Sequence, residues 1–204
     1  MAEIYTVCSY KGGVAKTTTA IHLAAYLNTL GRTLLIDGDP NRSALEWSQG
    51  GALPFDVADA NADTADTAGY DFAVVDTAAR PTRAEIADLV IAGAVFVVPT
   101  SPEVMSMNSA GMVAAALTRA NAASVAVLLT IVPPKPSHEG AGGRAYLVNV
   151  LRLPVMRAEI PRLGAYTKAS AESLTVDRVN DKQAARAWAA YVDFGKELIN
   201  GRSR

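Results

Sequence analysis

The sequence has few residues of the kinds that cross-link a protein or anchor it in a membrane. It contains one cysteine, Cys8, which excludes a disulfide within the chain and a cluster site built from several cysteines. Aromatic residues make up 6% of the sequence and charged residues 19%. No apolar stretch reaches the roughly 18 residues that a membrane-spanning helix needs, and no basic flank followed by an apolar signal region opens the chain. We therefore expect a cytoplasmic protein in which Cys8 is buried as a small apolar side chain.

Apolar residues and an uneven charge distribution are what the sequence does have. Half of the 204 residues are hydrophobic, which is enough for a large core and predicts one folded domain over residues 1–204. The net charge is only -1, but residues 1–143 carry 8 basic and 14 acidic side chains, whereas residues 144–204 carry 11 and 6. The basic C-terminal third is either an electrostatic footprint for nucleic acid or an ordinary solvated surface.

Short apolar runs alternate with helical patterns along the chain. The runs are continuously apolar, which is typical of parallel strands covered by helices on both faces. The repeated order of strand and helix predicts a doubly wound α/β fold with a mainly parallel sheet. The first helix is expected to end at Gly31, and residues 59–69 to form a surface loop or short helix. The expected strands are residues 4–8, 33–36, 55–58, 72–75, 94–98, 125–129 and 154–156, and the expected helices are residues 16–30, 83–91, 106–120 and 142–151.

The most informative segment lies between the first expected strand and the first expected helix. Its glycines let the backbone approach an anion, and the N-terminus of the following helix points N–H groups at it. In such a phosphate-binding loop, Lys16 bridges the β- and γ-phosphates, Thr17 ligates Mg²⁺ and Thr18 reaches the α-phosphate. The alternative is a glycine turn with two surface lysines. The segment consists of Lys11, Gly12, Gly13, Val14, Ala15, Lys16, Thr17 and Thr18.

This loop departs from the ordinary Walker A pattern because Tyr10 and Ala15 occupy the two glycine positions. What remains resembles the deviant Walker A form of the ParA/MinD superfamily, which carries an additional early lysine, here Lys11. The resemblance implies a P-loop NTPase fold, ATP and Mg²⁺ as cofactors, and catalytic roles for Lys11 and Lys16. It also implies that Lys11 reaches the nucleotide of a second subunit, so that ATP holds a homodimer together. Ala15 places a methyl group near the phosphates and restricts φ, but we expect nucleotide binding to survive.

Two acidic segments follow expected strands, at the edge where open α/β sheets bind ligands. The sequence Asp-Gly-Asp-Pro-Asn from Asp37 resembles a family segment that ends in glutamine, and residues 70–77 resemble a Walker B strand. By that resemblance, Asp39 orients the attacking water, Asp37 supports the metal and its waters, and Asp76 holds Mg²⁺ through a water. Asn41 stands in place of the usual glutamine. An ordinary Asp-Gly-Asp-Pro turn is the alternative for the first segment.

Other positions follow from the same resemblance. Residues 159–176 resemble a late family segment in which a proline loop borders the adenine, which makes Pro161 a nucleotide-binding candidate together with Thr130 and Pro133. Arg80 either approaches the phosphates or a partner subunit, or it forms a surface salt bridge.

The ParA/MinD resemblance favours a partition or positioning ATPase, closest to the small ParA type. Its ATP dimer would bind nucleoid DNA without sequence preference, and a ParB-like protein or cargo adaptor would stimulate hydrolysis. The cargo is a plasmid or a protein assembly such as a carboxysome, and the sequence does not separate the two. The basic residues available for DNA are Arg157, Arg162, Lys168, Arg178, Lys182, Arg186, Lys196, Arg202 and Arg204.

Two rival functions remain open. A MinD-like membrane regulator would need an amphipathic C-terminal helix, and residues 188–199 have apolar side chains at helical spacing. We expect that helix to pack on the core instead, and we expect no membrane partner. A metabolic enzyme of the same superfamily is the third possibility. The two histidines form no recognisable catalytic set, and His22, inside the first expected helix, is expected to be a packing residue.

Overall fold

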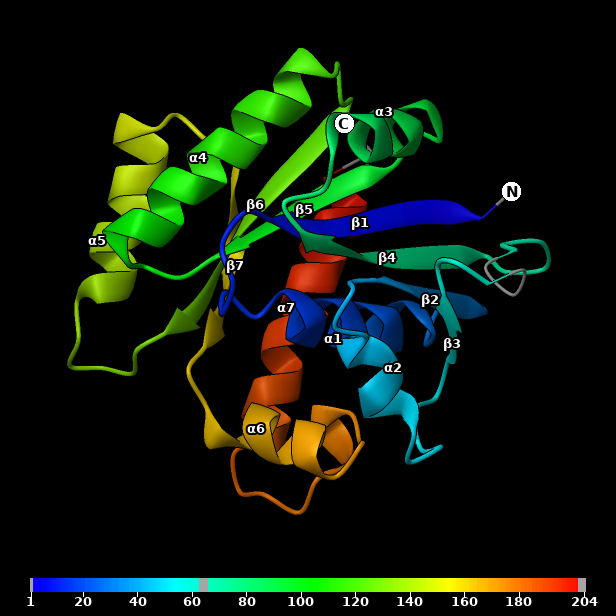
Figure 1. Cartoon of the computed structure of the whole chain (residues 1–204). Helices are drawn as coiled ribbons and strands as arrows, with labels where there is room; N and C mark the ends of the chain where they lie inside the picture. Colours follow the sequence, from blue (N-terminus) through cyan, green and yellow to red (C-terminus); the bar gives the residue numbers. More distant parts are fainter. Residues whose placement is uncertain (1, 63–65, 202–204) are drawn as a thin grey trace.

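The computed structural model describes residues 2–62 and 66–201 and contains one seven-stranded sheet (Figure 1). The strand order is β3-β2-β4-β1-β5-β6-β7, and every neighbouring pair is parallel. The doubly wound, parallel α/β fold predicted from the sequence is therefore confirmed. The strands are β1 (Glu3–Ser9), β2 (Thr33–Gly38), β3 (Asp56–Asp59), β4 (Phe72–Ala79), β5 (Val95–Thr100), β6 (Ser124–Val132) and β7 (Val155–Pro161).

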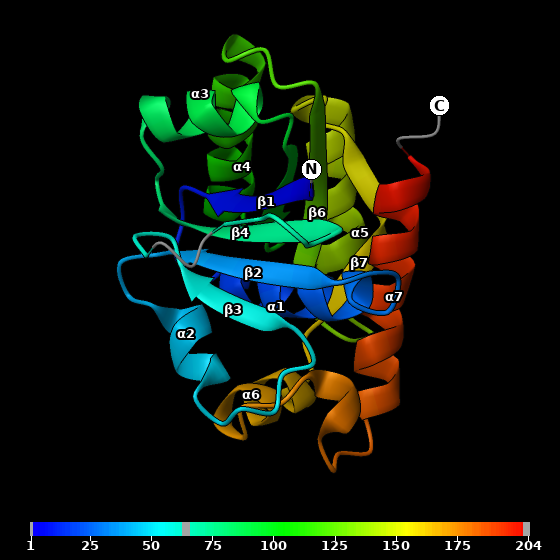
Figure 2. The ribbon, with the colours of Figure 1, turned by 90° about the vertical axis from the view of Figure 1, so that its right-hand side faces the viewer.

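Helices cover both faces of the sheet (Figure 2). One face carries α3, α4 and α5, and the other carries α1, α2, α6 and α7. A π-helical turn, η2, continues α5, and a 3-10 turn, η3, lies between α6 and α7. The helices are α1 (Lys16–Leu27), α2 (Ser43–Ser48), α3 (Arg83–Ile91), α4 (Val104–Arg119), α5 (Glu139–Ala145), η2 (Tyr146–Val150), α6 (Gly164–Ala171), η3 (Val176–Arg178) and α7 (Ala184–Asn200).

Strand β1 shows why the central strands read as unbroken apolar runs. Its alternate side chains enter two different cores, because successive residues of a strand point to opposite faces. Tyr5 and Val7 belong to the core under α1 and α7, whereas Cys8 belongs to the core under α3 and α4. Cys8 is buried, as predicted.

The boundary of the first helix differs from the prediction. Helix α1 ends at Leu27, because residues 28–30 leave the helix in a turn. Gly31 does not take the left-handed conformation expected of a helix-ending glycine. It is needed for close approach instead, since a Cβ there would lie 2.7 Å from Oδ2 of Asp71.

Other elements are longer or start elsewhere than predicted. Helix α5 starts at Glu139, three residues before the predicted start, and β6 and β7 extend to Val132 and Pro161. Helix α2 has no counterpart in the prediction. Within the described part of residues 59–69 there is no helix, and residues 63–65 of that predicted loop lie outside the described residues.

Helix α7 contains the amphipathic C-terminal segment. Tyr191 and Leu198 on its apolar face are buried in the core, and Trp188 packs against them partly buried. The prediction that this segment packs on the core is confirmed. Among the described residues, no helix combines the length and the hydrophobicity needed to cross a membrane.

Candidate functional site

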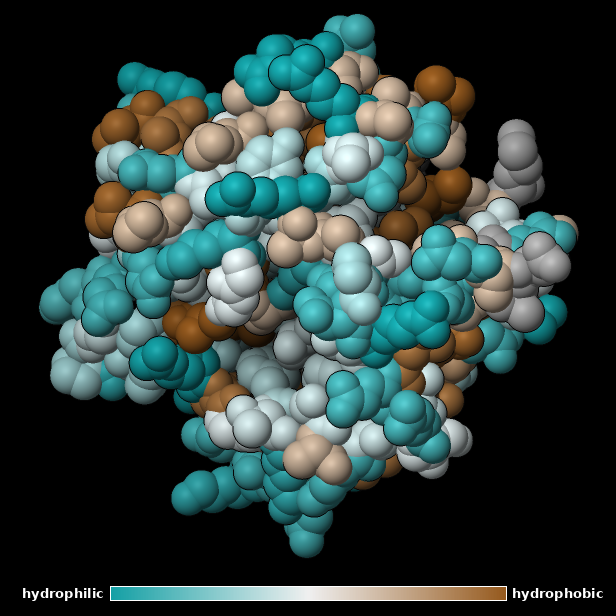
Figure 3. Space-filling model, in the orientation of Figure 1, coloured by the Kyte–Doolittle hydropathy of each residue, from teal (hydrophilic) through white to brown (hydrophobic). Residues whose placement is uncertain are grey.

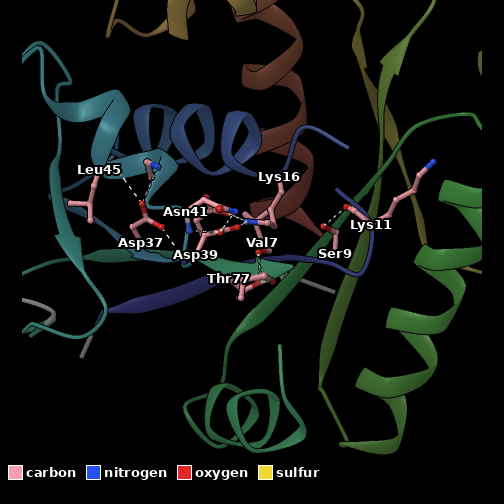
Figure 4. A network of polar contacts seen from close by, with 12 residues as sticks. Val7, Ser9, Lys11, Lys16, Asp37, Asp39, Asn41, Leu45 and Thr77 are labelled. Carbon is pink, nitrogen blue, oxygen red and sulfur yellow. Dashed lines mark hydrogen bonds and ion pairs between the residues drawn. The ribbon is translucent and has the colours of Figure 1, made fainter. Parts of the chain in front are cut away.

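The carboxyl ends of β1, β2 and β4 place the predicted site residues beside one another (Figure 4). In the sheet register, Asp76 of β4 lies opposite Val7 of β1 on one side and opposite Asp37 of β2 on the other. Because all strands are parallel, the loops that follow them emerge at the same edge. The phosphate-loop candidate and both acidic segments therefore converge on one site.

The loop between β1 and α1 forms an open cradle. Gly13 has φ +75°, and a Cβ added at Gly12 or Gly13 would meet nothing within 4 Å. Ala15, at the N-cap of α1, also takes the left-handed conformation, with φ 62°, which costs a non-glycine residue about 1 kcal/mol. No side chain caps this helix end, so its first N–H groups point into the cradle with the positive end of the helix dipole. This geometry suits an anion such as phosphate.

Lys16 lies at the centre of a buried charge cluster. Its Nζ is 2.9 Å from Oδ2 of Asp39 and 2.9 Å from Oδ1 of Asp76. Burial alone would lower the pKa of Lys16, but the two carboxylates raise it above its ordinary value. Burial would likewise raise the pKa of Asp39, yet the hydrogen bonds from Lys16 and Asn41 lower it. In Asp76 burial prevails and raises the pKa, although Lys16 opposes the shift.

Asp76 also carries an oxygen that the protein leaves unsatisfied. The residue is fully buried, and its Oδ2 has no hydrogen-bond partner among the described residues, a state that is rare and costly in folded proteins. The Thr17 hydroxyl lies close enough to lower the pKa of this carboxyl group. An unpaired carboxylate oxygen beside a threonine hydroxyl fits a hard cation such as Mg²⁺ or its bound water. Residues 2–62 and 66–201 contain no cluster of three or more His, Cys, Asp or Glu side chains able to hold a metal, so such an ion would need further ligand oxygens from a nucleotide or from water.

Asp39 and Asp37 are held in different ways. Oδ1 of Asp39 accepts hydrogen bonds from the backbone N–H and the side-chain amide of Asn41, which leaves Oδ2 facing Lys16. Asp37 accepts from the backbone N–H groups of Ala44 and Leu45 in the first turn of α2, and also from that of Asp39. Asp37 thus fixes α2 and the Asp39 loop, a role that sequence reasoning missed.

Lys11 points away from the cradle, toward α4 (Figure 4). Its ammonium group forms an ion pair with Glu103 at 2.9 Å and donates a hydrogen bond to Oγ of Ser106 at 2.9 Å. The buried Ser101 hydroxyl in turn donates to Oγ of Ser106. In this chain Lys11 therefore does not contribute to its own anion site.

Two further side chains brace the loop, one from β6 and one from the residue that follows β4. Thr130 donates to the carbonyl of Val14 at 3.0 Å, and the Nε of Arg80 donates to the carbonyl of Tyr10 at 3.3 Å. The structure places Thr130 beneath the loop, completely buried, rather than in an open cavity. Arg80 has φ 66° and also donates its backbone N–H to Ser9. No sequence signal distinguishes such supporting contacts from ordinary threonines and arginines.

A cavity of about 460 Å³ opens beside the cradle. Pro161 lines it, together with Ile131 and Thr18, whereas Pro133 lines a different cavity. The adenine contact expected of Pro161 stays a prediction. Ile131 takes a left-handed φ of 53° where the β6–β7 register shifts, which is a strained conformation for a β-branched residue. The size and the mixed polar and apolar lining suit a planar heterocycle next to phosphate.

His22 connects the loop helix to the far end of the chain. Its Nε2 accepts the N–H of Val176, so Nδ1 carries the proton and donates to the carbonyl of Thr18. The ring stacks on Tyr191 at 4.8 Å between centroids. Complete burial lowers the pKa of His22 to about 4, which keeps it neutral. The prediction that His22 is a packing residue is confirmed.

A glycine loop between a parallel strand and a helix, a buried lysine in its first turn and carboxylates on two adjacent strands define a nucleotide-binding protein of the P-loop type. The sequence profile of the family described as "CobQ/CobB/MinD/ParA nucleotide binding domain" matches residues 5–176. The chain belongs to this family, which confirms the ParA/MinD resemblance.

Individual relatives agree over nearly the full length. The chain is 33% identical over 203 residues, 96% of this chain and 94% of the relative, to "Maintenance of carboxysome distribution protein A" of Gloeobacter kilaueensis. An ATP complex of a Cyanothece McdA variant superposes with a TM-score of 0.74 at 15% identity, covering 98% of this chain and 96% of that one. The Mg-ADP complex of the septum site-determining protein MinD from Pyrococcus horikoshii superposes with a TM-score of 0.70 at 20% identity, covering 100% and 99%. At these identities the two structures show a shared fold.

Proposed function

We propose that this protein is an ATP-dependent positioning ATPase. It binds ATP and Mg²⁺ in the loop of residues 11–18, forms a nucleotide-sandwich homodimer, binds nucleoid DNA non-specifically and hydrolyses ATP when a partner protein stimulates it. The observation that carries this proposal is the position of Lys16, whose ammonium group lies between Asp39 and Asp76 at the open N-terminus of α1.

The residues fit ATP and Mg²⁺ by their chemistry. The N–H groups of Gly12, Gly13 and the first turn of α1 would hold the phosphates, with Lys16 as their counter-charge. Thr17 and Asp76 would hold Mg²⁺, which supplies charge neutralisation at the phosphoryl group. The carboxylate of Asp37 is occupied by backbone N–H groups. Its proposed support of the metal ion would therefore be indirect, through the position of the Asp39 loop.

Asp39 is the residue proposed to orient the attacking water. Asn41 fixes one oxygen of its carboxylate, and Lys16 holds the other. When Lys16 turns to a phosphate, that second oxygen becomes free to accept a proton from a water. The hydrogen bonds from Lys16 and Asn41 lower the pKa of Asp39, against burial, and those from Asn41 do not depend on the position of Lys16. They favour the ionised carboxylate, which is the form that can accept a proton.

The basic C-terminal third supplies the proposed DNA surface. Exposed cationic side chains occur along α7 and on the segments before it, whereas Arg202 and Arg204 lie outside the described residues. Lys and Arg contacts to phosphate are independent of sequence and weaken steeply with salt. The exposed members of this set are Arg157, Arg162, Arg178, Lys182, Arg186 and Lys196.

The cargo proposed for this system is a protein assembly. The relative that matches almost the whole chain is a carboxysome distribution protein, whereas the chromosome-partitioning ATPase Soj of Thermus thermophilus matches over 39 residues. Partition of DNA, a plasmid or a chromosome, is the second candidate, and that short match at 62% identity to a chromosome-partitioning ATPase favours it.

DNA retardation at two salt concentrations tests the proposal. Wild-type protein with ATP and Mg²⁺ should shift DNA of any sequence at low salt, and the shift should be lost without ATP. Lys16→Ala should neither bind ATP by calorimetry nor shift DNA. Vesicle flotation in the presence of ATP provides the contrast, because flotation without a DNA shift would show a membrane regulator. If the protein binds ATP but neither shifts DNA nor floats with vesicles, the proposed positioning role is contradicted, whereas the proposed nucleotide binding is not.

A further inference from the structure

Helix α4 exposes an apolar stripe that the fold does not cover. Val104, Met105 and Met112 are 61%, 76% and 63% exposed. Met105, Met112 and Ala115 lie on one side of the helix together with the polar Asn108, because these four positions are spaced by alternating steps of three and four residues. The opposite side packs on the sheet. Most surface apolar residues are scattered singly, whereas these lie in a row.

The adjoining turn η2 extends the same surface. Val148 and Val150 are 40% and 62% exposed, and the Tyr146 hydroxyl donates to Oδ1 of Asn108 at 2.9 Å, which ties η2 to α4. In the space-filling view, hydrophobic side chains gather over the area of α4 and α5 (Figure 3). Between α4 and the segment after η2 runs a groove of about 760 Å³, here called the α4 groove. Its lining includes Asn108, Met112, Ala115, Arg119, Leu151 and Arg152.

The charged residues that line the α4 groove have one sign. Between Glu103 and Glu139, and again between Glu139 and Glu159, the sequence contains no acidic residue. Arg119 and Arg152 line the groove, and within residues 2–62 and 66–201 neither forms an ion pair, since the ion pairs found there involve other side chains. The groove therefore offers an apolar floor with unneutralised positive charge.

We propose that the α4 groove docks an amphipathic helix of another protein, whose apolar stripe is flanked by acidic residues. A helix laid in a groove uses anchors at such three- and four-residue steps, and exposed methionines adapt to varied apolar partners. The two arginines select for carboxylates, because a complementary charge attracts the correct partner and a like charge repels the wrong one. Arg119 and Arg152 would repel a partner helix whose flanks are basic.

The location gives this docking surface a consequence for the nucleotide site. The stripe begins at Met105, two residues after Glu103, which holds Lys11. Ser106, the other partner of Lys11, belongs to the first turn of the same helix. A ligand that shifts the start of α4 would therefore change how firmly Lys11 is held. This consequence rests on the proposed function, whereas the docking itself does not.

Two designed helical peptides test the docking. Both carry leucines at heptad positions a and d, one with glutamates on the flanks and the other with lysines, and binding is followed by fluorescence anisotropy. The glutamate peptide should bind saturably, and Met112→Lys should weaken it by about tenfold or more, as for a central anchor. Reversing Arg119 and Arg152 to glutamate should transfer the preference to the lysine peptide. Leu30→Lys, which changes an exposed apolar residue just after α1, is the matched control and should have no effect.

Each outcome of these experiments either supports or overturns the docking proposal. The proposal would be overturned if the glutamate peptide did not bind at up to about 1 mM. It would also be overturned if both peptides bound equally before and after the charge reversal. ATP-independent self-association that Met112→Lys abolishes, measured by light scattering, would overturn it in favour of a second copy of this chain. ATP binding by Met112→Lys is measured in parallel. Normal ATP binding with lost peptide binding supports the groove, whereas a failure of wild type to bind ATP would count against the proposed function alone.

Discussion

At the scale of single residues, the site is defined by what each carboxylate already binds. One carboxylate oxygen of Asp39 accepts a hydrogen bond from Lys16 and the other accepts one from Asn41. The carboxylate of Asp37 instead accepts hydrogen bonds from backbone N–H groups. Asp76 also contacts Lys16, but it is completely buried. Asp39 is therefore the carboxylate that we propose exchanges a lysine for a water when a nucleotide enters. This difference leads to a specific prediction for Asp39.

Replacing Asp39 should separate binding from turnover. We expect Asp39→Ala to retain ATP binding and dimerisation but to lose phosphate release by about 100-fold or more, a typical loss for a residue that acts on the attacking group. Phosphate release and light scattering measure the two properties on the same sample. Asp88→Ala, which removes an exposed carboxylate of α3, should behave as wild type. Equal hydrolysis by Asp39→Ala and wild type would remove Asp39 from the reaction.

His22 should make the stability of the fold depend on pH. Burial lowers its folded pKa to about 4, against the opposing effects of the Thr18 carbonyl and Asp177, whereas the unfolded value is about 6.5. The unfolded state therefore takes up the proton first as the pH falls, so stability is complete above about pH 6.5 and is lost toward pH 4. Between pH 7 and pH 5 this loss should reach about 2 kcal/mol.

Urea unfolding of wild type and His22→Gln at the two pH values measures this contribution. The titrating carboxylates are common to both proteins, so the difference in pH dependence belongs to His22. His138→Gln, at an exposed position, serves as the control. Identical pH dependence in wild type and His22→Gln would show that the buried imidazole does not govern acid stability.

At the scale of elements, tight helix packing explains why certain glycines cannot be changed. A Cβ at Gly195 of α7 would lie 2.2 Å from the ring of Tyr26 in α1, whereas a Cβ at Gly142 of α5 would meet nothing within 4 Å. Gly195→Ala should therefore destabilise the protein by about 1–3 kcal/mol. Gly142→Ala should be neutral or stabilising by up to about 1 kcal/mol, because alanine favours the helix. Thermal unfolding compares the pair, and a comparable loss in both variants would contradict this packing.

The sequence predicted which helices and strands exist better than it predicted the residues at which they begin and end. All seven strands were predicted, because strands covered on both faces read as uniform apolar runs. Their order in the sheet depends on pairings between distant segments, and no local pattern encodes it. Helix α2 was missed because its six residues are too few for a clear period, and its first turn is fixed by Asp37 rather than by a local cap.

The same limit applies to the site. Lys16 and Thr17 belong to the phosphate-loop pattern, and Asp39 and Asp76 belong to acidic segments that follow or end apolar strands. The structure places Lys16 beside both aspartates, and the roles of these residues toward a nucleotide stay predictions. Contacts such as Thr130 to Val14 join residues more than a hundred positions apart. Single threonines and arginines carry no signal of such partners, so they emerge only from the fold.

At the scale of the whole molecule, the orientation of Lys11 leads to a prediction about assembly. Because Lys11 faces α4 rather than its own cradle, its removal should leave ATP binding by a single chain nearly intact. We expect Lys11→Ala to bind ATP within about threefold of wild type, since an exposed ion pair contributes little, yet to remain monomeric by light scattering with ATP and Mg²⁺. A Lys11→Ala protein that dimerises like wild type would exclude a role for this lysine across subunits.

The pairing of Lys16 with two aspartates has one more consequence. The resting pocket already contains negative charges beside its cation. In the proposed mode of binding, an incoming triphosphate would therefore substitute for Asp39 instead of neutralising an isolated positive group. Affinity then depends on the difference between two sets of ionic contacts, one internal and one brought by the ligand. A variant with a weaker internal set, such as Asp39→Asn, would bind nucleotide more tightly even as it turned over less.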